Sequence, residues 1–287
     1  HHYCFFFVGD YPCHWADCPH RFPFYLYNFL VLPLTPIKNN FVLVHFSGGS
    51  DSTLAAALCA ERFEKVRLIT YDRFSFIGAR DYTLPNFERL CRIYGKDKFE
   101  RIIYPIGRWH KKICYDRYVY FAQKYKLAVT SLAFCKLSMH WYSAVYSIEN
   151  GIGTVVDGVV PYMDLYPDQN ARISLDKLCD FYSGFGVRYE NPIYKIADEV
   201  ERLLYDKGIT ETPHIRGSEK DKQVFYAEQV VFALFVKYYA ERHGKDTYET
   251  VLSNLFREKI DFMRQTITDW IKDPNGSLVG RLKNNHA

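Results

Sequence analysis

An apolar strand pattern that runs into a glycine- and serine-rich turn and then into a helix pattern is the strongest constraint on the fold. Residues 41–46 read FVLVHF, residues 47–52 read SGGSDS, and an alanine- and leucine-rich run follows to residue 63. An apolar run without alternation is typical of a strand buried on both faces, and Ser and Asp favour a helix start. The stretch therefore predicts a strand, a tight turn and a helix, in that order.

The turn has the composition of a phosphate-binding loop. Backbone N–H groups at a helix N-terminus attract an anion, the helix dipole adds to that attraction, and serine hydroxyls supply further donors. A Walker loop is disfavoured because the SGGSDS turn contains no lysine, and the glycine spacing differs from that of a dinucleotide-binding turn. The alternative interpretation is a turn that is rich in Gly and Ser for structural reasons alone.

Strand and helix patterns alternate along the next part of the chain. Strands are expected at 65–72, 101–107, 127–131 and 153–160, and helices at 86–95, 115–126, 138–150 and 192–207. This order predicts an α/β fold with an open, mostly parallel sheet and helices on both faces. Beyond residue 218 apolar residues recur at helical spacing, which predicts a helical C-terminal extension.

These patterns suggest three parts: a Cys/His-containing segment (3–39), a central domain (40–212) and the helical extension (213–287). The 287 residues, 48% of them hydrophobic, suffice for one large α/β core with an appendage. A net charge of +4 gives no sign of a dedicated nucleic-acid surface. We find no apolar run long enough for a membrane span and no cleavable signal pattern, and scattered single cysteines fit a reducing compartment. We therefore expect a cytoplasmic protein.

The SGGSDS turn resembles the SGGxDS signature of the PP-loop, or N-type ATP pyrophosphatase, family, and the resemblance covers roughly residues 40–210. It implies an adenine nucleotide alpha-hydrolase-like fold. In this family an oxygen of the substrate attacks the α-phosphate of ATP, pyrophosphate leaves, and a nucleophile then displaces AMP. By this resemblance the phosphate ligands would be Ser47, Gly48, Gly49, Ser50, Asp51 and Ser52. Asp51 would also be catalytic, because its carboxylate would help to place Mg²⁺.

Two later segments are similar to 7-cyano-7-deazaguanine synthases: VVDGVVPYMDLYPDQNARI over 155–173 and ENPIYKIADEV over 190–200. The similarity implies that Lys195 binds phosphate and that Asp164, Tyr166 and Asp168 bind a purine substrate. A carboxylate accepts hydrogen bonds from guanine N1–H and N2–H, and a tyrosine offers a stacking face. A surface turn is the alternative for the Tyr-Pro-Asp element. Those synthases carry a zinc-binding cysteine cluster near the C-terminus, whereas no cysteine follows position 179 here.

The N-terminal segment offers another metal site. Cys4, Cys13, Cys18 and His20 would supply the four ligands of a structural zinc ion. Their spacing differs from that of a standard zinc knuckle. An iron–sulfur cluster and ordinary buried cysteines remain the alternatives.

Two cysteines are candidates for carrying sulfur. Cys114 follows the third predicted strand, where open parallel sheets bind ligands, and nearby basic or imidazole side chains would favour its thiolate. Those neighbours are Arg108, His110, Lys111 and Lys112. Cys135 lies between a predicted strand and a helix, in an arrangement similar to the catalytic-cysteine region of PP-loop tRNA thiouridylases. We expect Cys114 to carry the sulfur, with Cys135 as second candidate or as its resolving partner.

Together these features lead us to expect a sulfurtransferase that uses ATP and Mg²⁺. It would adenylate the carbonyl oxygen of a guanine-like purine and replace it with sulfur, giving a thioamide-type base such as 6-thioguanine, AMP and pyrophosphate. The expected partners are the purine, a sulfur donor such as a cysteine desulfurase, and a second copy bound through the C-terminal helices. The alternatives are tRNA thiolation, 7-cyano-7-deazaguanine synthase-like amidation, and a nucleotide-binding interaction protein without turnover.

Overall fold

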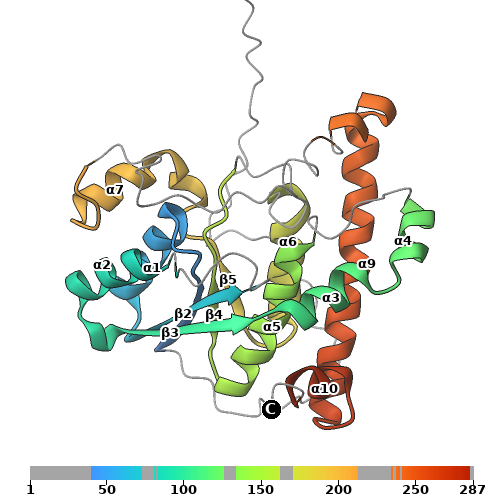
Figure 1. Ribbon diagram of the computed structural model, residues 1–287, viewed down its shortest axis with the longest axis horizontal. Coiled ribbons are helices and arrows are strands. Elements are labelled where there is room, and N and C mark those ends of the chain that lie inside the picture. Colours follow the sequence, from blue (N-terminus) through green and yellow to red (C-terminus); the bar gives the residue numbers. More distant parts are fainter. Residues whose placement is uncertain are drawn as a thin grey trace, which may run out of the picture. The chain divides into compact units, whose positions relative to one another are not determined.

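A computed structural model (Figure 1) describes residues 40–72, 81, 83–125, 134–161, 171–212, 234, 237–239 and 241–284. They belong to one of the two units into which the chain divides, Pro33–Ala287. Several predicted features lie outside the described residues and stay predictions. These are the strand at 127–131, the substrate residues Asp164, Tyr166 and Asp168, and the zinc ligands Cys4, Cys13, Cys18 and His20.

A parallel sheet forms the centre of the described unit. Its strands lie in the order β3-β2-β1-β4-β5, and every neighbouring pair is parallel. The strands are β1 (Phe41–His45), β2 (Lys65–Asp72), β3 (Phe99–Pro105), β4 (Thr154–Val156) and β5 (Arg188–Glu190). The order reverses between β1 and β4, and in open α/β sheets ligands bind beyond the carboxyl ends of strands at such a point.

Helices cover both faces of this sheet, as predicted (Figure 1). On one face α1 (Ser50–Arg62), α2 (Leu84–Tyr94) and α7 (Val200–Asp206) pack against alternate side chains of β1, including Val42 and Val44. On the other face Leu43 belongs to a larger cluster, most of whose helical side chains come from four helices. These are α3 (Gly107–Tyr115), α5 (Cys135–Asn150), α6 (Ala171–Ser183) and α9 (Lys245–Lys272).

The C-terminal helical prediction is confirmed for α9, and a short helix, α10 (Leu278–Asn284), follows it. The apolar residues of α9 lie in the same hydrophobic cluster as Leu43 of β1. Leu255, Phe256, Met263 and Ile267 are fully buried there. The extension therefore shares a core with the sheet. None of the described helices is both long and apolar enough to cross a membrane.

Three local differences from the sequence prediction have physical reasons. The helix expected at 115–126 is observed as α4 (Tyr118–Tyr125). The preceding helix α3, which the sequence analysis missed, ends before Arg117, whose φ is 57°. The expected helix at 192–207 begins as a 3₁₀ turn, η2 (Tyr194–Glu199), before α7. The sequence analysis missed α6 and the three-residue β5, because so short a strand carries almost no periodic pattern.

Candidate functional site

The predicted phosphate loop joins β1 to α1 at the carboxyl edge of the sheet. Gly48 has a φ of 76°, in the left-handed region that glycine adopts without steric cost. Gly49 is the N-cap residue of α1, and its carbonyl accepts hydrogen bonds from the Thr53 N–H at 3.0 Å and the Thr53 hydroxyl at 2.8 Å. The predicted strand, turn and helix are thus confirmed.

Hydroxyl groups within the loop fix its shape. The Ser52 Oγ accepts a hydrogen bond from the Ser47 N–H at 3.2 Å and donates to the Gly49 carbonyl at 3.1 Å. The Asn86 side chain on α2 donates to the Gly48 carbonyl at 2.7 Å. The N–H groups of the first turn of α1 have no acceptor within the helix. The loop therefore presents donors at a helix N-terminus beside the point where the strand order reverses, an arrangement suited to phosphate.

A glycine after β4 lets that segment of the chain approach the loop. A β-carbon on Gly158, just beyond β4, would lie 3.1 Å from the Asp51 carbonyl carbon and 3.1 Å from the Ser52 nitrogen. Both neighbours are backbone atoms, so they cannot move aside as a flexible side chain would. The segment after β4 and the start of α1 consequently meet at a position that accommodates only glycine without adjustment.

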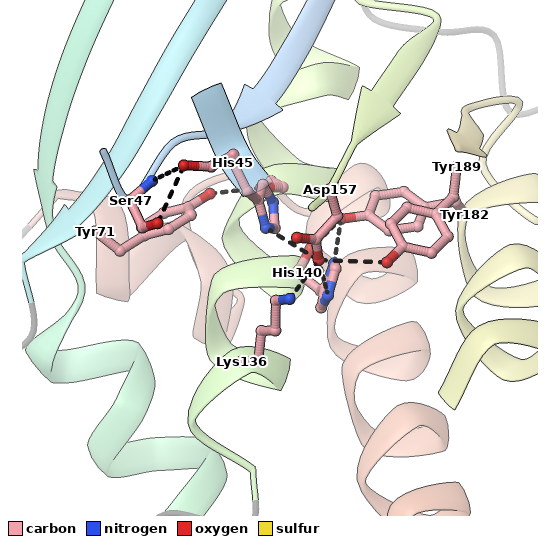
Figure 2. Close-up of polar contacts among 10 residues, drawn as sticks. His45, Ser47, Tyr71, Lys136, His140, Asp157, Tyr182 and Tyr189 are labelled. Carbon is pink, nitrogen blue, oxygen red and sulfur yellow. Dashed lines mark hydrogen bonds and ion pairs between the residues drawn. The ribbon is translucent and has the colours of Figure 1, made fainter. Parts of the chain in front are cut away.

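A buried polar cluster lies beneath the loop on the α5 side of the sheet (Figure 2). Its members are His45 at the end of β1, Asp157 directly after β4, and Lys136 and His140 on α5. The Asp157 Oδ2 lies 2.8 Å from Lys136 Nζ, 3.5 Å from His140 Nε2 and 3.8 Å from His45 Nδ1. The cluster thus connects the two strands at the switch point with the helix that covers them.

Hydroxyl side chains surround the cluster and orient it. The Ser143 Oγ lies 2.6 Å from His45 Nε2 and 2.5 Å from the Tyr71 hydroxyl. The Tyr182 hydroxyl lies 3.0 Å from His140 Nδ1, and the Tyr189 hydroxyl donates to Asp157 Oδ2 at 3.3 Å. Each imidazole therefore has one ring nitrogen in a hydrogen bond and the other directed at the Asp157 carboxylate.

Burial and charge set the protonation states in the cluster. Burial lowers the pKa of His45 to about 4 and that of His140 well below its usual value. For Asp157 burial acts to raise the pKa, but Lys136 and the two histidines outweigh it and hold the pKa below its usual range. At neutral pH the carboxylate is consequently ionised and both imidazoles are neutral.

The two candidate sulfur carriers lie in different surroundings. Cys114 is 1% exposed within the large hydrophobic cluster, with its Sγ 3.4 Å from His110 Nδ1. The Cys114 thiol is therefore not accessible to solvent, because the apolar face of α3 packs inward. Cys135 is half-buried and is the first residue of α5, directly before Lys136. Lys195, the predicted phosphate ligand, is exposed on η2.

Sequence reasoning missed the buried polar cluster. His45 and Asp157 both lie at the carboxyl ends of neighbouring strands, and a polar residue in that position was the available signal. Lys136 and His140 are one helical turn apart on α5, which places them on one face. Nothing in the sequence shows that these four residues, which lie in three separate parts of the chain, come together in the fold.

No protein-family model matches the chain, and no curated protein is similar to it in sequence. One similar solved structure is a 4-thiouridine synthetase in complex with RNA and ATP, at 14% identity and a TM-score of 0.42, covering 77% of this chain. Another is the U34-tRNA thiolase NcsA from Methanococcus maripaludis with its [4Fe-4S] cluster, at 15% identity and a TM-score of 0.40, covering 79%.

A third is a predicted tRNA methyltransferase subunit from Methanocaldococcus jannaschii, at 18% identity and a TM-score of 0.34, covering 64% of this chain and 92% of its own length. The chain spans 53% of the synthetase and 75% of the thiolase. At this level of similarity none of the three carries a functional argument.

Proposed function

We propose that this chain is a PP-loop ATP pyrophosphatase that adenylates a purine carbonyl oxygen and then replaces it with sulfur. The observation that carries the proposal is the SGGSDS loop, which turns from β1 into α1 where the strand order reverses. Gly48, Gly49 and Ser50 would bind the phosphates of ATP there. Asp51, in the first turn of α1, would help to place Mg²⁺ through its carboxylate.

Two of the three loop serines proposed as phosphate ligands, Ser47 and Ser52, would have separate roles. The Ser52 side chain is buried and engaged with the Gly49 carbonyl, so it contributes by shaping the loop. Ser47 is exposed, and its hydroxyl lies 3.1 Å from the Ser52 hydroxyl. In the proposed site Ser47 would contact phosphate, while Ser52 would act through the loop backbone.

For sulfur transfer, the position of Cys135 favours it over Cys114. Lys136, the next residue, reaches Asp157, and the neighbouring Gly158 abuts the start of α1. Cys135 therefore begins a helix at the same edge of the sheet as the loop, where the helix dipole favours its thiolate. Cys114 is on α3, which follows the edge strand β3, and its sulfur is buried.

Chemically, the purine oxygen would attack the α-phosphorus, and pyrophosphate would leave with the bonding electron pair. Cys135 would receive a sulfane sulfur by persulfide transfer from a donor such as a cysteine desulfurase, so no oxidant is needed. The Cys135 persulfide would then form the new carbon–sulfur bond through its terminal sulfur as AMP leaves. A second thiol would have to cleave the remaining sulfur–sulfur bond and would end in a disulfide with Cys135. Cys114 is a candidate for that thiol; an added thiol reductant is the alternative.

Mass spectrometry of the products tests the proposed function. The protein would be incubated with ATP, Mg²⁺, a cysteine desulfurase with cysteine as persulfide donor, and a panel of purines, and in parallel with tRNA. Free sulfide would be supplied as a separate sulfur source. We expect a thiolated free purine together with AMP. Thiolated tRNA without a purine product would move the assignment to the tRNA alternative, and a nitrile or amide product would indicate amidation. Nucleotide binding without turnover under all conditions would contradict the enzyme assignment.

Cysteine variants test the choice of sulfur carrier. We expect Cys135→Ser to keep ATP binding and to lose the thiolated product, and Cys114→Ser to retain more activity. Cys91→Ser, which removes another partly buried thiol on α2, is the matched control and should behave as the wild type. Loss in Cys114→Ser with full activity in Cys135→Ser would reverse the assignment. Full activity in both would mean that free sulfide attacks the adenylate directly.

A further inference from the structure

The buried cluster beneath the loop contains a group of side chains suited to bind a metal ion. His45, His140 and Asp157 each offer one ligand atom, and these atoms lie within 4.8 Å of one another. They come from β1, α5 and the residue after β4, so the fold brings together three positions far apart in sequence (Figure 2). All three side chains are more than nine-tenths buried.

Two ring nitrogens in the group lack a hydrogen-bond partner. His45 Nδ1 and His140 Nε2 are buried and have none among the described residues, although both face the Asp157 carboxylate. Buried polar atoms are nearly always satisfied, so two exceptions directed at one oxygen require an explanation. A cation between the nitrogens and the oxygen would satisfy all three atoms.

The hydrogen bonds of Tyr182 favour one tautomer of His140. The Tyr182 hydroxyl contacts the His140 carbonyl at 3.2 Å and His140 Nδ1 at 3.0 Å. A carbonyl only accepts, and a hydroxyl has one proton to give. Both contacts are satisfied when Tyr182 donates to the carbonyl and Nδ1–H donates to the phenol oxygen. His140 Nε2 then directs a lone pair at the carboxylate oxygen 3.5 Å away, which is repulsive unless a cation lies between them.

Distances and ligand types match a borderline divalent cation. Two imidazoles and one carboxylate suit Zn²⁺ and related ions, and bonds of this kind place neighbouring ligand atoms about 3.4 Å apart in a tetrahedral site. The observed separations from Asp157 Oδ2, 3.5 and 3.8 Å, are close to that value. The hydroxyls of Ser143 and Tyr182 hold the outer ring nitrogens, as partners of metal-bound histidines commonly do.

Lys136 supplies the positive charge in the present arrangement. Its ammonium lies 2.8 Å from Asp157 Oδ2, where it would compete with an incoming cation. The Lys136 side chain is 15% exposed and leaves from the first turn of α5, so it can turn towards solvent. The Lys136 ammonium therefore neutralises the buried Asp157 carboxylate in the place of a metal ion.

We propose that His45, His140 and Asp157 bind one divalent cation of the zinc class, and that Lys136 neutralises Asp157 when the cation is absent. Three protein ligands leave a coordination position for water or a substrate oxygen. This inference is independent of the proposed adenylation, because it is argued from His45, His140 and Asp157 and not from the phosphate loop. Its test requires neither ATP nor a purine.

The test is a Zn²⁺ titration of metal-depleted, full-length protein. Cys4→Ser, Cys13→Ser, Cys18→Ser and His20→Ala are introduced first, so that the N-terminal candidate ligands cannot contribute. Isothermal titration calorimetry should give one equivalent of bound Zn²⁺ and a higher melting temperature in its presence. In this background His140→Ala and Asp157→Asn should each weaken binding at least about tenfold.

Lys136→Met should change the Zn²⁺ affinity in the opposite direction from His140→Ala and Asp157→Asn. A variant that failed to fold would not bind Zn²⁺ more tightly. Removing the competing ammonium should tighten Zn²⁺ binding by at least about threefold. His110→Ala, at a buried histidine outside the cluster, is the matched control and should leave binding unchanged. The proposal is overturned by an absence of binding, by weaker binding in Lys136→Met, or by binding that survives His140→Ala. Loss of binding in His110→Ala would move the site to the His110–Cys114 pair and would overturn it as well.

Discussion

Single residues define the proposed site at the carboxyl edge of the sheet. Gly48 permits the left-handed turn, Gly49 caps α1 and Gly158 permits close contact with β4. His45 and Asp157 lie beside them on the opposite face of the sheet from α1. The loop was predictable from its residue types and their order. The polar cluster was not, because its members are brought together only when β1, β4 and α5 pack.

Asp51→Asn tests the metal and phosphate role of the loop carboxylate. We expect pyrophosphate release to fall at least about tenfold, because losing a charge-assisted contact costs on the order of 1.5–3 kcal/mol. Asp97→Asn is the matched control, since it makes the same change at an exposed position just before β3, at the opposite edge of the sheet. Steady-state release would be measured for both, and an unaltered rate in Asp51→Asn would contradict the assigned role.

Gly158→Ala tests the close contact between β4 and the loop. The new β-carbon would lie 3.1 Å from two backbone atoms of Asp51 and Ser52, so we expect a loss of stability of about 1–3 kcal/mol and weaker ATP binding. Gly184→Ala places a β-carbon no closer than 3.4 Å to its neighbours and should change neither property much. Urea unfolding and nucleotide titration measure both. Equal stability and equal ATP affinity in the two variants would show that a β-carbon at position 158 can be accommodated.

At the scale of elements, apolar patterns located β1 to β4 but overestimated the length of β4, which was expected over 153–160 and spans Thr154–Val156. They predicted short or interrupted elements poorly. The strand at 65–72 was predicted with its observed bounds, and the first strand ended one residue early. The break between α3 and α4 depends on the backbone of Arg117, which no periodicity reveals. The burial of Cys114 was not predicted for a related reason. The basic residues around it in sequence share α3 with Trp109 and Ile113, whose buried face also holds the thiol.

The helix α9 carries a buried lysine whose charge opposes folding. Lys259 is 3% exposed, lies 4.2 Å from the Phe121 ring centroid, and has a pKa lowered to about 8, mainly by burial. Below pH 8 the ammonium is charged in both states, so the full cost is present. Between about pH 8 and 10.5 the unfolded chain binds more protons, so the stability contribution of Lys259 rises with pH.

We therefore expect Lys259→Met to be more stable than the wild type at pH 7, by on the order of 1–3 kcal/mol. That advantage should shrink as the pH rises from 8 towards 10.5. Urea unfolding at several pH values checks both statements, with the exposed Lys237→Met as control. A difference that stays constant with pH would show that Lys259 is not held with a lowered pKa.

For the whole molecule, the alternation of strand and helix patterns predicted the α/β class. It did not predict how the hydrophobic core is divided between the two faces of the sheet. The sheet separates two hydrophobic clusters, and α9 completes the one that contains Leu43 and Val155. A helical pattern at the end of a chain does not say what its apolar face covers. The structure shows that Phe256 and Met263 of α9 lie in the same hydrophobic cluster as side chains of α5 and α6.

Truncation after Thr212 tests whether α9 is needed by the sheet. Because the deletion uncovers one face of a parallel sheet, we expect the shortened chain to lack cooperative unfolding and to bind no ATP. Circular dichroism during thermal unfolding and nucleotide titration are the measurements. Phe256→Ala in the full chain should cost about 3–5 kcal/mol on the same reasoning. A truncated protein that folds and binds ATP would show that the sheet does not need the residues after Thr212.

The central claim is that the loop directs cleavage between the α- and β-phosphates of ATP. The most direct measurement is the identity of the nucleotide and phosphate products when the full chain turns over ATP with a purine labelled with ¹⁸O at its carbonyl. The account predicts equal amounts of AMP and pyrophosphate, with the ¹⁸O recovered in AMP. ADP with orthophosphate, or AMP without the label, would contradict it.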